Sequence, residues 1–249
     1  MVQPEDGKVF PQGMEPLGKG TFQFACHPGL ACFMACCRRQ ELILYPYDVL
    51  RLKKALGLSS GELLERHTVA GRGANPYFPT LFLRMADNAE HTCPFLGEGG
   101  CTVYEDRPTA CRTYPLERAV DRSPGRGQPR DHYFLKRHPY CLGHGEDRSW
   151  TVRDWLRDQR LLDFNTMNDL WTEMDTLFAG NPWQGEGAYG PRQKVAFMVC
   201  YNLDLFRIYL ADHQILESMR LSRRERQELA GDEALLRFGF RWLRGVLAA

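Results

Sequence analysis

The stretch CHPGLACFMACC, from Cys26 to Cys37, places four cysteines within twelve residues. These are Cys26, Cys32, Cys36 and Cys37, and four more follow at Cys93, Cys101, Cys111 and Cys141. Thiolates are soft ligands that hold zinc or iron–sulfur clusters in proteins. We therefore predict that these eight cysteines ligate metal. The ninth, Cys200, lies in a helical pattern, and we interpret it as a small buried hydrophobic residue.

The composition of the chain is that of an ordinary globular protein. Its 249 residues are 43% hydrophobic and 25% charged, enough to bury a substantial core. The net charge of +1 favours neither nucleic acid nor an anionic membrane as a partner. Apolar runs such as Val195–Val199 are too short to span a bilayer, and the polar start Met1–Lys8 does not resemble a secretory signal. We therefore expect a cytoplasmic protein, in which clustered cysteines are metal ligands more often than disulfides.

The pattern along the chain predicts a mainly α protein in three regions. Residues 1–25 are rich in proline and glycine and predict an irregular lead-in. Residues 26–148 form the loop-rich, cysteine-bearing region, and residues 149–249 have helical periodicity. We expect the helical region to pack against the cysteine region and to share one core with it.

Several shorter elements follow from local patterns in the first 148 residues. Apolar spacing predicts a helix over Tyr47–Leu56, and Ser59 or Ser60 can cap a second helix that ends at His67. Thr80–Met85 predicts a short strand, whereas the polar stretch Arg118–Arg130, with two prolines and two glycines, predicts a surface loop.

Four helices are predicted in the C-terminal region. One begins near Thr151 and carries Trp155, Leu156, Leu161 and Leu162, and a second carries apolar residues from Met167 to Phe178. A long third helix begins at Pro191 and continues to Leu210, and Glu233–Leu247 forms the last.

The spacing of the cysteines leaves their division between sites open. Adjacent side chains on an extended backbone point to opposite sides, so Cys36 and Cys37 need not bind the same atom. One could bind locally while the other reaches the segment from Cys93 to Cys111. Eight thiols could fill two four-cysteine sites, or four could hold one cluster while the others pack or take part in redox exchange.

The spacing of the cysteines also leaves the identity of the metal open between zinc and an iron–sulfur cluster. Ferredoxin-type spacings and paired C-x2-C zinc knuckles are both absent. Ligands spread over several loops suit a cubane 4Fe–4S cluster at least as well as a tetrahedral zinc site. We therefore prefer an iron–sulfur cluster, with zinc as the alternative.

Several of these segments resemble a known family, the YkgJ-type cysteine-cluster proteins, also described as a zinc- or iron-chelating domain. The resemblance covers about residues 22–145. It rests on the block at 26–37, YPYDVLRL at 45–52, CPFL at 93–96, GCTVY at 100–104, RP at 107–108 and CRTYP at 111–115. The gap between Cys26 and Cys32 is longer than is usual in the family.

The resemblance implies metal chelation by the cysteines and leaves the activity open. One branch with a similar cysteine pattern includes flagellin lysine methylases, which use S-adenosylmethionine. A cluster-dependent modifying enzyme is therefore one alternative to an electron-transfer or redox role. A structural zinc adaptor, with the helical region as the surface for an unknown protein partner, is another. The sequence assigns no catalytic residue, and whether the protein is an enzyme and how it oligomerises stay open.

Charged and aromatic residues near the cysteines have two readings. Arg107 and Arg112 flank Cys111 and could stabilise a negatively charged cluster, or they could pair with Glu105 or Asp106. Tyr104 and Tyr114 are interpreted as packing residues that shield the site. Four histidines lie near cysteines, but because eight thiols already suffice we expect them not to bind metal: His27, His91, His138 and His144.

Overall fold

The computed structural model describes residues 16–122 and 130–248. The protein is mainly α, as predicted: about 48% of it is helical, with ten α-helices in the described ranges. Contacts divide it into two compact units, each interrupted in sequence. The first contains the described residues up to Arg38 and Ala110–Leu162, and the second contains Arg39–Thr109 and the described residues from Asp163 onward. The region boundaries predicted at residues 25/26 and 148/149 stay a prediction, and residues 1–15 of the predicted lead-in lie outside the described residues.

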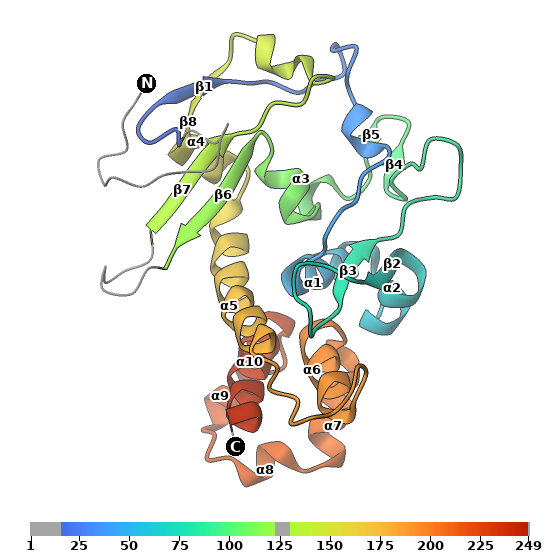
Figure 1. Ribbon diagram of the computed structural model, residues 1–249, viewed down its shortest axis with the longest axis vertical. Coiled ribbons are helices and arrows are strands. Elements are labelled where there is room, and N and C mark those ends of the chain that lie inside the picture. Colours follow the sequence, from blue (N-terminus) through green and yellow to red (C-terminus); the bar gives the residue numbers. More distant parts are fainter. Residues whose placement is uncertain (1–15, 123–129, 249) are drawn as a thin grey trace. The chain divides into compact units, whose positions relative to one another are not determined.

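Short strands and turns make up most of the first unit (Figure 1). Strand β1 pairs antiparallel with β8, and β6 pairs with β7. The elements are β1 (Thr21–Gln23), the 3-10 helix η1 (Ala35–Cys37), α3 (Thr109–Thr113), β6 (Leu116–Asp121), β7 (Arg130–Leu135), the 3-10 helix η3 (Leu142–Gly145), β8 (Ser149–Thr151) and α4 (Val152–Asp158).

A small aromatic core holds this unit together. The ring of Trp155 meets Phe22, Phe24 and Trp150 edge-on, at centroid distances of 5.8, 5.6 and 5.1 Å. The two indole N–H groups donate to main-chain carbonyls, that of Trp150 to Phe24 at 2.8 Å and that of Trp155 to Thr113 at 3.0 Å. Buried indole groups are thus hydrogen-bonded, and they fix the segments on which cysteines lie.

The loop predicted over Arg118–Arg130 is wrong at both ends, which belong to the β6–β7 hairpin. Tyr133 and Phe134 on β7 are buried, so this strand contributes to the core. Opposite charges on the two strands also pair, because Arg118 donates to both carboxylate oxygens of Asp131 at 3.0 and 2.8 Å. Residues 123–129 of the predicted loop lie outside the described residues.

Helices dominate the second unit, with two short strand pairs and one 3-10 turn beside them in the described ranges. Strand β2 pairs with β3, which is the strand predicted to begin at Thr80, and β4 pairs with β5. The elements are α1 (Pro46–Leu56), α2 (Ser60–His67), β2 (Thr68–Gly71), β3 (Thr80–Leu83), β4 (Leu96–Gly97), β5 (Gly100–Cys101), the 3-10 helix η2 (Tyr104–Asp106), α5 (Leu161–Ala179), α6 (Pro191–Tyr201), α7 (Leu203–Asp212), α8 (Ile215–Ser218), α9 (Arg223–Glu228) and α10 (Asp232–Ala248).

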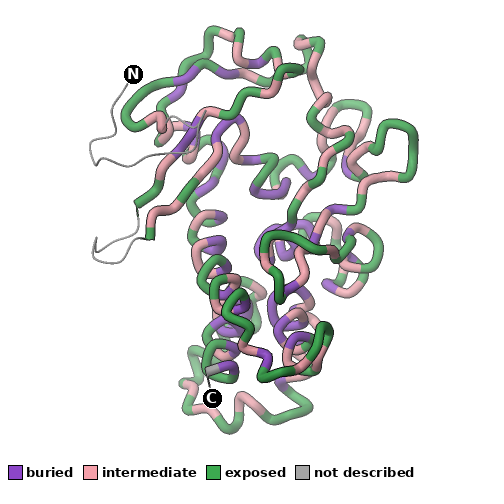
Figure 2. The backbone as a smooth tube through the Cα atoms, in the orientation of Figure 1, coloured by how far each residue is buried: buried purple, intermediate pink, exposed green. Residues whose placement is uncertain are grey.

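The core of this unit lies among α5, α6, α7 and α10, whose inward faces are buried (Figure 2). Trp171 of α5 contacts Tyr201 of α6 and Phe240 of α10, at ring-centroid distances of 5.7 and 6.3 Å. Gly239 lets α10 approach α6 closely, since a β-carbon there would lie 2.7 Å from a methyl group of Val199. Among the described residues no helix is both long and apolar enough to cross a membrane.

The predicted helices over Tyr47–Leu56 and Glu233–Leu247 agree closely with α1 and α10. The helix predicted from Thr151 through Leu162 is wrong at its end, because α4 stops at Asp158 and α5 begins at Leu161. Helix α2 begins after Ser59, whose hydroxyl accepts from the Glu62 amide at 3.2 Å while the Glu62 carboxylate accepts from the Ser59 amide at 2.9 Å. The long helix predicted from Pro191 to Leu210 instead breaks at Asn202. The Asn202 side chain accepts from the Leu205 amide at 3.2 Å and so starts a new helix.

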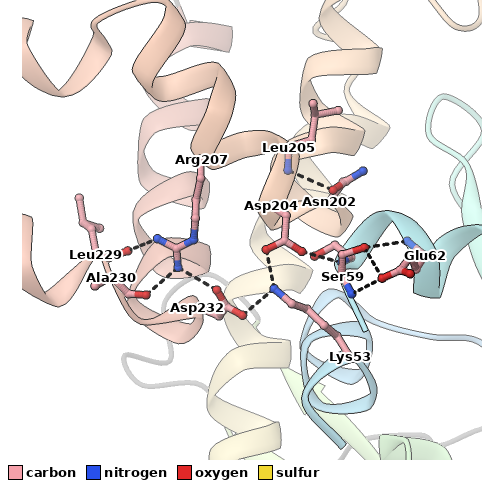
Figure 3. A network of polar contacts seen from close by, with 11 residues as sticks. Lys53, Ser59, Glu62, Asn202, Asp204, Leu205, Arg207, Leu229, Ala230 and Asp232 are labelled. Carbon is pink, nitrogen blue, oxygen red and sulfur yellow. Dashed lines mark hydrogen bonds and ion pairs between the residues drawn. The ribbon is translucent and has the colours of Figure 1, made fainter. Parts of the chain in front are cut away.

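A polar network connects α1, α7 and α10 (Figure 3). The Lys53 ammonium donates to Asp204 at 2.7 Å and to Asp232 at 2.9 Å. Arg207 also donates to Asp232, at 2.8 Å, and to the main-chain carbonyls of Leu229 and Ala230. Charges from three helices therefore compensate one another at this junction.

Candidate metal centre

The predicted ligands are distributed over both units. All nine cysteines are thiols in the structure. The second unit contains Cys93 and Cys101, and Cys200 lies 1% exposed in α6, as predicted for a buried residue. The first unit contains Cys26, Cys32, Cys36, Cys37, Cys111 and Cys141.

The backbone at Cys36 and Cys37 is not extended, which corrects the premise used for this pair. Met34 adopts a left-handed conformation with φ of 66°, and the 3-10 turn η1 follows it. The two thiols are hydrogen-bonded to each other, and this bond from Cys37 lowers the pKa of Cys36 to about 7, although burial opposes the shift. About half of the Cys36 thiol is therefore ionised at neutral pH, and the thiolate is the form that binds metal.

Two distant segments meet at Cys32. The amide of Leu142 donates to the Cys32 sulfur at 3.2 Å, and the amide of Ala25 donates to the Gly143 carbonyl at 3.1 Å. A β-carbon on Gly143 would lie 2.4 Å from the Ala25 oxygen, so only glycine allows this approach. Amide donors to sulfur are typical partners of metal-bound thiolates.

Tyr114 brings the end of α3 to the same place. Its hydroxyl lies 3.2 Å from Nε2 of His144, and its ring stacks on His138 with 5.4 Å between centroids. Burial raises the pKa of Tyr114, and so does a hydrogen bond to the Cys141 thiol. Thus segments that carry Cys32, Cys111 and Cys141 lie together in the first unit.

His27 is occupied by other contacts. Its Nε2 lies 3.0 Å from a carboxylate oxygen of Glu146, and its Nδ1 accepts from the Gly29 amide at 3.2 Å. Both ring nitrogens of His27 thus have partners, and that His27 does not bind metal stays a prediction.

In the second unit, Cys93 and Cys101 lie on one small hairpin. Leu96 on β4 is opposite Cys101 on β5, and the Leu96 amide donates to the Cys93 carbonyl at 3.0 Å. Phe95, 3% exposed, anchors the turn, and its carbonyl accepts from the amide and hydroxyl of Thr102. A local turn therefore brings two predicted ligands onto the same element.

Within the described ranges, no three His, Cys, Asp or Glu side chains are gathered closely enough to hold a metal ion. What the structure brings together are pairs and neighbouring segments, and the full ligand set stays a prediction. Leu142 lies 110 positions from Cys32, and no sequence signal marks so distant a donor. The hydrogen bond from Leu142 to Cys32, like that from Tyr114 to Cys141, could therefore not have been predicted.

Residues 25–142 match the model of the CxxCxxCC family, whose description is "Putative zinc- or iron-chelating domain". The matched segment is similar to that family over this range. The match confirms the resemblance seen in the sequence, and it includes all eight predicted ligands. No curated protein and no solved structure matches the chain.

The donor set of the chelating domain fits both metals of its description. Thiols in several loops, two of them with hydrogen-bond donors and one with a lowered pKa, are suitable ligands for zinc or for iron–sulfur clusters.

Two buried arginines lie beside Cys111 in sequence. The guanidinium of Arg107 lies 3.8 Å from the ring centroid of Tyr104, and Arg112 donates to the Gln159 carbonyl at 2.6 Å. Asp106, one of the partners considered for these arginines, accepts from Arg51 at 2.7 Å.

Proposed function

We propose that the chelating domain holds a cysteine-ligated metal centre, with an iron–sulfur cluster as the preferred content and zinc as the alternative. The observation that carries this proposal is the family match over 25–142, which contains every predicted ligand. The ligands are Cys26, Cys32, Cys36, Cys37, Cys93, Cys101, Cys111 and Cys141.

The contacts around the sulfurs support this assignment. A thiolate buried without donors is destabilised, whereas hydrogen bonds from an amide or hydroxyl stabilise its charge. Cys32 has the Leu142 amide, Cys141 has the Tyr114 hydroxyl, and Cys36 has the neighbouring thiol. These cysteines would hold a soft metal, and their donors would stabilise the charge of the sulfurs. An iron–sulfur cluster, when bound, would accept or release single electrons.

We further propose that the protein acts in the reducing cytoplasm, where thiols stay available for metal, and that its role is electron transfer or another redox-linked step. Bonds from the cysteines to the metal would then stabilise the loop-rich region over 26–148 in place of part of an apolar core.

Metal and acid-labile sulfide analysis of protein purified without oxygen tests the proposal. Iron and sulfide in near-equal amounts, with broad visible absorbance, would support the cluster. Zinc without sulfide would exclude the redox role. Cys111→Ser should lower the metal content, whereas Cys200→Ser, which alters the buried thiol of α6, should not. No bound metal of either kind in the wild-type protein would refute the proposal.

A structural zinc adaptor is the second candidate, and one observation in the second unit favours it. Three apolar side chains of α7 and α10 are exposed: Leu205 (46%), Ile208 (56%) and Val246 (40%). They lie on the helices that also line a shallow apolar hollow with Tyr209 and Trp242. This reading predicts a colourless zinc protein whose helical surface binds another protein.

A further inference from the structure

Residues of α6, α7 and α10 in the second unit line a shallow hollow of about 210 Å³. Its lining side chains are aliphatic or aromatic except for one charged residue, Arg192. The aromatic part of the lining is fixed, because the ring of Trp242 contacts Tyr209 at 6.1 Å and Phe206 at 5.6 Å between centroids. A hollow fixed in this way binds an apolar side chain without the cost of ordering its own lining.

Arg192 gives the hollow a positive charge that is only partly compensated. Its Nε lies 3.7 Å from a carboxylate oxygen of Glu186, which is beyond hydrogen-bond distance, and Glu186 instead accepts from the Arg192 main-chain amide at 2.8 Å. The Nη1 atom of Arg192 is buried and has no hydrogen-bond partner within the described residues. Because a buried donor without an acceptor costs free energy, a ligand that brings an anionic oxygen to Nη1 is favoured.

The size and surroundings of the hollow favour a protein segment over a free small molecule. Pockets for drug-sized ligands measure about 300–1,000 Å³, which is more than this hollow holds. Beside it, Leu205 and Ile208 are exposed and lie on the same face of α7 as Tyr209. The apolar surface therefore continues along α7, as in grooves that bind one face of an amphipathic helix. Tryptophan, tyrosine and arginine, all present in the hollow, are also the residue types that dominate binding at protein interfaces.

We propose that the hollow and the exposed face of α7 bind an amphipathic helix of a partner protein, with apolar side chains against Tyr209, Trp242 and Val246 and an acidic side chain on Arg192. This inference states the class of partner for the surface of the second candidate function. It does not depend on the metal that the chelating domain holds, so its failure would leave the proposed metal centre in place.

The test uses a synthetic peptide of about 16 residues, above the length at which isolated helices are marginal in water. It has leucines at positions i, i+3, i+4 and i+7 and glutamates beside them, and a second peptide has glutamine in place of each glutamate. Binding of both labelled peptides to the whole chain is measured by fluorescence anisotropy. The acidic peptide should bind about tenfold more tightly, which is the contribution of one hydrogen bond between charged groups.

Two variants connect this binding to the hollow. Val246→Glu should weaken binding of the acidic peptide at least about tenfold, because it places a like charge in the apolar lining. Val69→Glu on β2 is the matched control and should bind as the wild type does, since Val69 is 44% exposed against 40% for Val246 and does not line the hollow. Arg192→Gln should bind the two peptides equally, with the wild-type affinity for the glutamine peptide. Far-ultraviolet circular dichroism checks that each variant is folded.

Several results would overturn the inference. They are no binding of the acidic peptide, equal binding of both peptides by the wild type, wild-type binding by Val246→Glu, and an unchanged preference for the acidic peptide in Arg192→Gln. A dimer in light scattering that Val246→Glu separates into monomers would instead assign the surface to a second copy of the chain. Sedimentation with phosphatidylglycerol vesicles that Val246→Glu abolishes would assign it to a membrane, and either result would also overturn the inference.

Discussion

Lys53→Met is expected to destabilise the second unit by removing the cation at the centre of the network in Figure 3. The Lys53 side chain is only 13% exposed and donates to Asp204 at 2.7 Å and Asp232 at 2.9 Å. Methionine keeps most of the length and apolar character of the side chain, so the packing of its apolar stem should change little.

The magnitude follows from the exposure of the two carboxylates, 37% for Asp204 and 29% for Asp232. A hydrogen bond to a charged group contributes about 1.5–3 kcal/mol when buried, and an exposed ion pair only about 0.2–1 kcal/mol. Partial exposure places each contact near 1 kcal/mol, so the loss should be about 2 kcal/mol. Arg207 and the Ser60 amide remain as partners of the two carboxylates, which prevents a larger loss.

Urea unfolding followed by far-ultraviolet circular dichroism measures this difference in the free energy of unfolding. Lys54→Met is the matched control, because Lys54 is the adjacent residue on α1 and is exposed. If Lys53→Met lowers the free energy of unfolding by no more than about 0.5 kcal/mol beyond Lys54→Met, the reasoning from this network is wrong.

Three further outcomes are expected. Burial would raise the pKa values of Asp204 and Asp232, but hydrogen bonds from Lys53 and, for Asp232, from Arg207 outweigh burial and lower both pKa values. The stability that the two carboxylates contribute is therefore complete above about pH 4 and is lost as the pH falls further. Urea unfolding at pH 3 should accordingly show a smaller effect of Lys53→Met than at pH 7. Gly143→Ala should destabilise the protein by about 1–3 kcal/mol, because its β-carbon would lie 2.4 Å from the Ala25 oxygen, whereas Gly145→Ala meets nothing within 4 Å; equal melting temperatures would contradict this. Cys200→Ala should leave the metal content of purified protein unchanged, and any loss of metal would show that this buried thiol matters to the centre.

Local chemistry made a good part of the fold predictable. Helix α2 could be placed because Ser59 and Glu62 are three residues apart and satisfy each other's amides. Helix α6 could be placed because proline suits the first helical turn, where no amide donor is needed. In both cases the decisive interaction lies within a few residues of the chain.

Other elements could not be predicted from the sequence, for three different reasons. The β6–β7 hairpin reads as a polar loop, since Arg118 and Asp131 look like solvated charges until the strands pair. The break at Asn202 was hidden because apolar spacing continues across it from α6 into α7. Of the eight strands in the described ranges, β3 was predicted, and the others were not, because strands of two to six residues give too short a pattern to be recognised by periodicity.

The same division applies within the candidate site. That cysteines bind soft metals is a property of the thiol itself, so the sequence alone identifies the residues that matter. How each thiol is presented depends on donors that the fold supplies, and Cys32 receives its amide donor from a residue 110 positions away. A family motif can fix Tyr114 near Cys111 in sequence without indicating that its hydroxyl lies 3.2 Å from Nε2 of His144. For this reason the cysteines alone would not determine the properties of the proposed centre: a donor such as the Leu142 amide changes the charge on the sulfur that it contacts, and proteins with the same cysteine spacing can therefore differ in metal affinity and reduction potential.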